Sequence, residues 1–103
     1  MDDLGQPIAY TVLEEGTPVY DLHGERIGVV EHVLGDFSAD IFDGVIVHTH
    51  PFPGRHLFAD ADQIAELHER GVVLSVDRGD LHEPSQKSEA TLRRAWDWIT
   101  GQR

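Results

Sequence analysis

The chain has 103 residues, no cysteine and a formal net charge of −11, from 8 Lys and Arg against 19 Asp and Glu. This length supports one domain with one hydrophobic core, and the lack of cysteine excludes disulfides, thiolate catalysis and cysteine-based metal centres. The negative charge repels phosphate backbones, so it disfavours nucleic-acid binding and favours basic protein partners.

The first residues, 1–15, are predicted to lead into a domain that begins at Gly16. Gly5 and Pro7 interrupt regular structure there, and the apolar residues from Ile8 onward can add only a short strand. The segment lacks the basic and apolar regions of a secretory signal, and no apolar run in the chain approaches the roughly 20 residues that span a bilayer. We therefore expect a cytoplasmic protein that makes no membrane contact.

Short strands and tight turns are predicted for the next part of the chain. After a first strand, Asp21 can accept a backbone N–H and Gly24 can adopt a positive φ, as a tight turn requires. The second strand is rich in valine, and Gly28 inside it indicates a bulge. The expected strands are residues 17–20, 27–34, 45–50 and 56–58, with an Asp43-Gly44 turn before the third and a proline-rich turn after it.

The segment from Asp60 to Gly71 fits two local structures. Asp60 and Gln63 form a capping-box pattern that favours a helix. The four residues that end at Gly71 instead repeat the earlier turn, with glycine in fourth place, just before a valine-rich strand. In that second interpretation, residues 64–67 form one strand of a hairpin and Gly71 has the same positive φ as Gly24.

The C-terminal part, residues 85–102, is predicted to be an amphipathic helix. Leu92, Ala95, Trp96 and Ile99 are spaced at i, i+3, i+4 and i+7, which places them on one face. A helix of this length is marginal alone in water, so its apolar face needs a surface on the same chain or on a second copy. We expect a homodimer in which this helix contributes to the interface.

Four blocks of the sequence follow one another in a characteristic order. Residues 16–34 read Gly-Thr-Pro-Val-Tyr-Asp-Leu-His-Gly-Glu-Arg-Ile-Gly-Val-Val-Glu-His-Val-Leu, a strand, a glycine turn and a valine-rich strand. Residues 43–47 read Asp-Gly-Val-Ile-Val, residues 57–64 read Leu-Phe-Ala-Asp-Ala-Asp-Gln-Ile, and residues 71–76 read Gly-Val-Val-Leu-Ser-Val. Together these blocks resemble the PRC-barrel family over roughly residues 16–77.

The resemblance implies a mainly β fold, a small antiparallel β-barrel of about five or six strands at residues 16–80, followed by the C-terminal amphipathic helix. It also favours the strand interpretation of residues 64–67. The family includes the cytoplasmic domain of the photosynthetic reaction-centre H subunit and the C-terminal domain of a ribosome-maturation factor, which dock onto other macromolecules rather than catalyse. A non-catalytic protein–protein interaction or assembly module is therefore the expected function.

Aromatic residues are the candidates for partner binding. Phe52 lies between two prolines, where a rigid loop can present its side chain as a contact anchor, although it could instead close one end of the barrel. Trp96 and Ile99 lie on the apolar stripe of the predicted helix, whereas Trp98 lies off it and suits an interface or the barrel edge. These four residues are the predicted binding site for a basic protein partner.

Three of the seven histidines are the candidates for metal binding. His48 and His50 alternate on one predicted strand, which puts both rings on one face, and His56 lies across an expected hairpin. Three imidazoles can hold zinc with an open position; the alternative is that all three are solvated side chains, because no acid is adjacent in sequence to orient them. A metal-binding protein is thus one alternative function, and a ribosome-associated factor that binds a basic protein is another.

Catalytic signatures are absent from the sequence. It has no Gly-x-Ser-x-Gly elbow, phosphate loop or dinucleotide-binding glycine pattern. Asp60 and Asp62 could act as paired carboxylates, but capping of a turn accounts for them better. We therefore expect no enzymatic activity and no cofactor.

Overall fold

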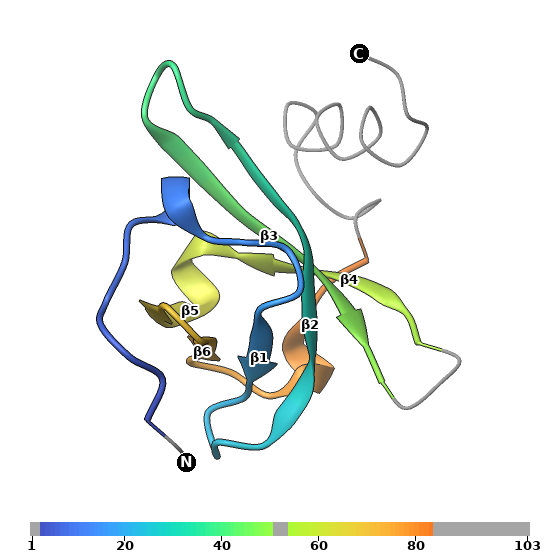
Figure 1. Ribbon diagram of the computed structural model, residues 1–103. Helices are drawn as coiled ribbons and strands as arrows, with labels where there is room; N and C mark the ends of the chain where they lie inside the picture. Colours follow the sequence, from blue (N-terminus) through green and yellow to red (C-terminus); the bar gives the residue numbers. More distant parts are fainter. Residues whose placement is uncertain (1–2, 51–53, 84–103) are drawn as a thin grey trace.

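The computed structural model describes residues 3–50 and 54–83, which form one six-stranded sheet (Figure 1). The strands lie in the order β4-β3-β2-β1-β6-β5, and short 3-10 helices precede, connect and follow them along the chain. The elements are η1 (Tyr10–Val12), β1 (Pro18–Tyr20), β2 (Arg26–Asp36), β3 (Ile41–Thr49), β4 (His56–Asp60), η2 (Ala61–Gln63), β5 (Ile64–His68), β6 (Gly71–Leu74) and η3 (Arg78–Asp80).

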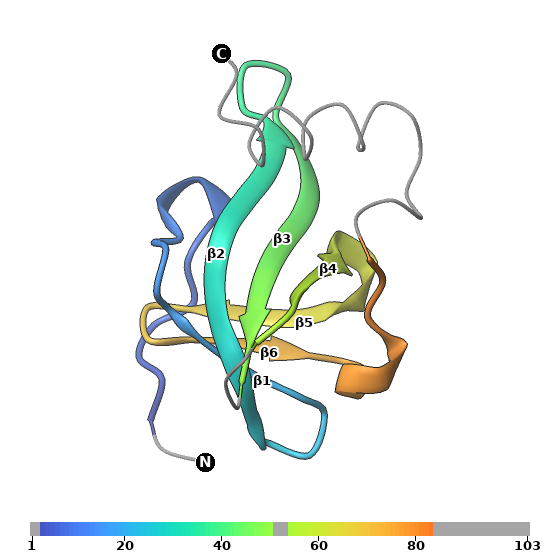
Figure 2. The same ribbon diagram turned by 90° about the vertical axis from the view of Figure 1, so that its right-hand side faces the viewer.

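The sheet bends so that its two halves face each other. β2 and β3 form a long hairpin with β4 beside it, and the shorter β5–β6 hairpin runs across them (Figure 2). β1 joins the two halves, because it pairs antiparallel with β2 on one side and parallel with β6 on the other. The apolar faces of both halves therefore meet in the middle.

The main hydrophobic core fills this space between the halves. Val45 and Val47 of β3 belong to it, whereas Ile46 between them contributes to a second, smaller cluster, as the two-residue period of a strand requires. Because the chain has no disulfide, this burial carries the stability, and a fully buried aliphatic side chain contributes about 1.5–3 kcal/mol. The main core consists of Leu13, Val19, Ile27, Val30, Val45, Val47, Leu57, Ala59, Val72, Leu74 and Leu81, and the second cluster of Leu34, Ile46 and Phe58.

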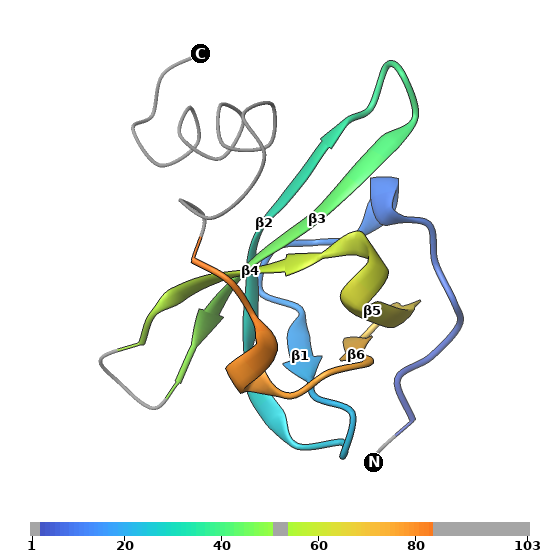
Figure 3. The same ribbon diagram turned by 180° about the vertical axis from the view of Figure 1, so that it is seen from behind.

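The predicted antiparallel barrel is wrong in two respects, although six strands lie within the expected number. β1 and β6 run parallel, and the outermost strands β4 and β5 do not pair with each other in the described part of the chain. The physical reason is that other segments already bond to these strands. Phe58 of β4 exchanges two backbone hydrogen bonds with His82, at 2.6 and 3.1 Å, where the chain returns past β4 after η3 (Figure 3).

Residues 4–8, here called the N-terminal segment, cover the outer side of β5 and the turn after it. They form a single isolated bridge, between Pro7 and His68, rather than the short strand that the sequence allows. Three backbone hydrogen bonds of 2.8–3.0 Å hold the segment in place. They run from Ile8 to Leu67, from Glu69 to Gln6 and from Arg70 to Leu4.

The turn between β2 and β3 lies at residues 37–40, so the predicted turn at Asp43-Gly44 is wrong. Asp40 takes up the left-handed conformation there, with φ 55°. Gly44 lies inside β3 with φ 141°, and a Cβ at this position would come within 2.1 Å of the Ala59 carbonyl oxygen. The glycine is therefore needed for the close approach of β4 rather than for a turn.

The hairpin interpretation of residues 64–67 is confirmed, because β5 and β6 pair antiparallel. The capping box of Asp60 and Gln63 is also present, but it closes only the single turn of η2. Gly24 has the predicted positive φ, at 79°, whereas Gly71 does not and packs against Leu4 instead.

The predicted helix at residues 85–102 lies outside the described residues. Within residues 3–50 and 54–83 the only helices are the single 3-10 turns η1, η2 and η3. No helix in this part of the chain is both long and apolar enough to cross a membrane.

Candidate functional site

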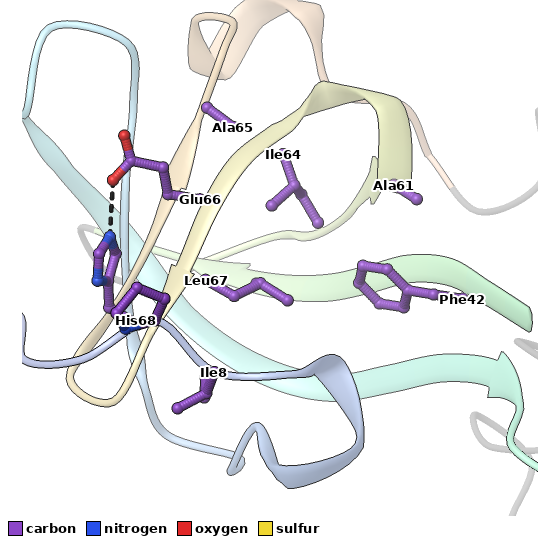
Figure 4. Close-up of a pocket in the computed structure, with 9 residues that line it drawn as sticks. Ile8, Phe42, Ala61, Ile64, Ala65, Glu66, Leu67 and His68 are labelled. Atoms are coloured by element: carbon purple, nitrogen blue, oxygen red, sulfur yellow. Dashed lines mark hydrogen bonds and ion pairs between the residues drawn. The ribbon is translucent and has the colours of Figure 1, made fainter. Parts of the chain in front are cut away.

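A groove of about 490 Å³ lies between the N-terminal segment, β5 and β3 (Figure 4). Side chains from these parts of the chain, and Ala61 from η2, gather around it, and Glu66 and His68 form its polar end. We call it the β5 groove. Its principal apolar lining consists of Pro7, Ile8, Phe42, Ala61, Ile64 and Leu67.

The floor of the β5 groove is anchored in the protein interior. Ile8, Phe42, Ile64 and Leu67 are partly buried and pack against the main core, so their outer surfaces form the groove while their inner surfaces are fixed. Such backing limits side-chain rearrangement, because protein interiors are close-packed. The groove is therefore a preformed apolar surface, which is the usual character of a binding site.

His68 links the N-terminal wall of the groove to β5. Its Nε2 lies 2.6 Å from a carboxylate oxygen of Glu66, and its Nδ1 lies 3.0 Å from the carbonyl oxygen of Gly5. Both partners are acceptors, and only the protonated imidazolium has an N–H on each nitrogen to donate to them. The hydrogen bond to Glu66, followed by the bond to Gly5, accordingly raises the pKa of His68 above its ordinary value.

Three aromatic rings extend the groove toward the β2–β3 turn. Tyr10 stacks on Phe42 with ring centroids 4.8 Å apart and meets Phe37 edge-on at 5.3 Å. The Tyr10 hydroxyl donates a hydrogen bond of 2.8 Å to Asp40, which raises the pKa of the tyrosine. We call Tyr10, Phe37 and Phe42 the aromatic tip, and it remains open to solvent, because Phe37 is 51% exposed and the neighbouring strand residue Ile41 is 48% exposed.

A second group of functional side chains lies on β2, β3 and β4. His48 and His56 are directly opposite each other in the β3–β4 ladder, and their rings meet edge-on with centroids 4.9 Å apart. Glu31 of β2 places a carboxylate oxygen 3.4 Å from His48 Nδ1. The structure thus brings together two of the three predicted histidines with an acid, whereas His50 is not part of this group.

The other predicted binding residues, Phe52, Trp96, Trp98 and Ile99, lie outside the described residues. Sequence reasoning missed both the β5 groove and Glu31. The exposed pair Phe37 and Ile41, which flank a polar turn, was the available signal for the aromatic tip. Glu31 carried no local signal, because a β2–β3 register that sequence alone does not fix brings it beside His48.

A comparison of the sequence with known protein families covers the sheet described above. The PRC-barrel domain matches residues 15–82, which is more than half of the chain. The chain belongs to the PRC-barrel family. No curated protein matches the sequence closely enough to add to this assignment.

The PRC-barrel domain contains all six strands, and with them Glu31, His48 and His56. The β5 groove and the aromatic tip also include residues that lie before this domain in the sequence. Pro7 and Ile8 of the groove and Tyr10 of the aromatic tip all precede the matched residues. The candidate binding surface is therefore built where a segment outside the family match packs onto the family fold.

Proposed function

We propose that this PRC-barrel domain is a non-catalytic docking module that binds a basic protein segment through the β5 groove and the aromatic tip. The observation that carries the proposal is an apolar groove that continues without interruption, through Phe42, into partly exposed aromatic rings. Contiguous exposed apolar surface of this kind is typical of interaction sites, and buried aromatic anchors contribute most to binding at interfaces. The cytoplasm suits such a role, since the fold uses no disulfide.

Acidic residues flank this apolar surface. Asp36 and Asp40 lie at or beside the turn of the aromatic tip, Asp62 follows a lining residue of the groove in sequence, and Glu66 lies at its polar end. Glu69 follows His68 in sequence and accepts a hydrogen bond from the backbone N–H of Gln6. With a net charge of −11, the chain attracts positively charged partners over distances of about a Debye length. The matching partner is a segment that combines apolar side chains with Lys or Arg.

The predicted homodimer is a competing arrangement, because a second copy could occupy the same surface. Two copies that each carry a charge of −11 repel each other, whereas a basic segment is attracted. The basic partner is therefore our proposal, and a second copy is an outcome of its test.

The test replaces Phe37 with a photo-crosslinking phenylalanine analogue and compares it with the same replacement of Leu22. The two side chains are matched, because Phe37 is 51% and Leu22 is 49% exposed, but Leu22 lies in the turn between β1 and β2. Capture of a basic protein through position 37 and not through position 22 is expected. The captured protein is then purified, and its affinity for the intact wild-type chain is compared with its affinity for variants of the chain.

The affinity measurement decides the proposal. Phe37→Ala should weaken binding about tenfold, as loss of an aromatic anchor does, whereas Leu22→Ala should leave it unchanged. The affinity should also fall as salt is added. Equal effects of the two variants, capture of an acidic protein, or crosslinking to a second copy through position 37 would each overturn the basic-partner proposal.

A further inference from the structure

We propose that Glu31, His48 and His56 form a binding site for one divalent transition-metal ion of the class of Zn²⁺, with a coordination position left open. One ligand atom from each residue lies within 4.8 Å of the other two. The site is separate from the β5 groove, because His48 is six residues along β3 from Phe42, a distance of about 20 Å in an extended strand. The inference does not depend on the docking function.

The distances suit a tetrahedral ion. Ligand atoms bound to zinc at about 2.0–2.1 Å are about 3.3–3.4 Å apart at the corners of a tetrahedron. The Glu31 carboxylate and His48 Nδ1 already have this separation, at 3.4 Å. The ligand atoms of the remaining pairs lie no more than 4.8 Å apart, so movement of the exposed His56 side chain toward the other two ligands would complete the set.

The backbone holds the three residues in this arrangement. His48 and His56 are cross-strand partners, and such pairs have Cβ atoms about 4.5–5.5 Å apart. Glu31 is the extra residue of a bulge in β2, because Val30 pairs with Val47 and His32 with Ile46. Bulges redirect side chains, and this one leaves the Glu31 carboxylate beside His48 rather than in a regular ladder position.

The His48 ring is also confined from the other side. A Cβ at Gly54 would come within 2.7 Å of its Nε2 and 2.6 Å of its Cδ2, so the glycine backbone lies directly against the imidazole. This contact leaves Nδ1 as the nitrogen that faces Glu31. A ring that is fixed in this way needs little reorganisation to bind an ion.

The donor set selects the class of ion. Two imidazoles and one carboxylate suit zinc and its neighbours among the first-row metals, whereas calcium and magnesium prefer oxygen ligands alone. The side chains of His48 and Glu31 are 44% and 31% exposed, so solvent reaches the site and can fill the open position. The net charge of −11 further favours a cation.

Isothermal titration of the full, tag-free chain with zinc chloride tests the proposal. We expect one ion per chain, and His56→Ala and Glu31→Gln should each weaken binding by at least about tenfold, since even residues outside the ligand set cost this much at metal sites. His56 is exposed and Glu31 is at the surface, so both variants should fold, which circular dichroism checks. The matched control is His50→Ala, an exposed histidine near the end of the same strand, which should leave binding unchanged.

Nuclear magnetic resonance gives a second readout. Zinc should shift the ring signals of His48 and His56 and leave those of His50 in place. Millimolar or absent binding by the wild type would overturn the proposal. The same conclusion would follow if His50→Ala weakened binding as much as His56→Ala, because the ion would then be held by surface histidines in general.

Discussion

Two turns of this protein, at residues 21–24 and 68–71, share a sequence pattern but are held in different ways. In the first, the buried Asp21 side chain accepts two backbone N–H groups at 2.9 Å each, and Gly24 has a positive φ. In the second, two backbone N–H groups donate instead to the N-terminal segment, and Gly71 has no positive φ. The first turn is therefore stabilised mainly by its own Asp21 side chain, with one longer backbone hydrogen bond of 3.3 Å from Leu22 to Val76, and the second by residues more than 60 positions away.

A shared turn pattern thus predicts the position of a turn but not how the turn is held. Glycine in fourth place located both turns correctly, but its physical role differs between them. At Gly24 it permits a backbone conformation, whereas at Gly71 it makes room for the Leu4 side chain and the Tyr20 ring. The local sequence can indicate the backbone conformation at Gly24, whereas the close packing at Gly71 depends on residues far away in the chain.

Of the substitutions at the two turns, Gly71→Val should reduce stability most. The added Cβ would come within 2.8 Å of a methyl carbon of Leu4 and 3.1 Å of the Tyr20 ring, and overpacking of this kind costs about 1–3 kcal/mol. We expect a loss of this size, about 1–3 kcal/mol, in the free energy of unfolding, measured by chemical denaturation. Gly79→Val is the control, because no atom lies within 4 Å of a Cβ there.

The cause of the Gly71→Val effect can be isolated with Leu4→Ala. If the clash with Leu4 dominates, the double variant should lose less stability than the sum of the two single variants. Additive losses would show that a clash with the Leu4 side chain is not the cause of the Gly71→Val effect.

Gly24→Val should have a smaller effect, of about 1–2 kcal/mol, because a β-branched residue is strained at φ 79°. Gly24→Asn should recover most of this loss, since asparagine tolerates the left-handed conformation. Denaturation curves of the two variants test the expectation. If both variants lost the same amount of unfolding free energy, backbone strain at residue 24 would not explain the need for glycine.

Replacement of His68 should change the stability least among these variants, and the size of this change should depend most on pH. Its folded pKa is raised, so its stabilising bonds are fully present below its unfolded pKa of about 6.5 and are lost as the pH rises through the folded value. Melting temperatures of the wild type and His68→Gln should therefore converge as the pH is raised. Glu66→Gln should reduce the same pH dependence, and a constant gap at all pH values would contradict the role assigned to the imidazolium.

The sequence predicted the strands well where hydrophobic character and turn chemistry agreed. Strands were expected at residues 17–20, 27–34 and 56–58, and β1, β2 and β4 lie there. The bulge indicated by Gly28 is also present, since the β1–β2 register shifts beside it. The start of β3 was missed because Asp43-Gly44 has the composition of a turn, while the contact that requires Gly44 comes from β4.

Long-range features were beyond the reach of local patterns. The parallel pairing of β1 with β6 and the position of the N-terminal segment on β5 depend on residues far apart in the chain. The same holds for the candidate sites. The pairing of His48 with His56 follows from a hairpin that could be foreseen, whereas Glu31 joins them through a register that could not.

The segments that lie along β4 and β5 also restrict how a partner can bind. An exposed strand edge is a template for added strands, both in fibrils and in peptide recognition by β-augmentation. Here backbone groups of Phe58 and Leu67 at the two ends of the sheet already have hydrogen-bond partners, in His82 and Ile8. These contacts oppose the addition of a strand at Phe58 and at Leu67. They favour recognition through side chains there, so that specificity depends on apolar and charged groups rather than on an extended backbone.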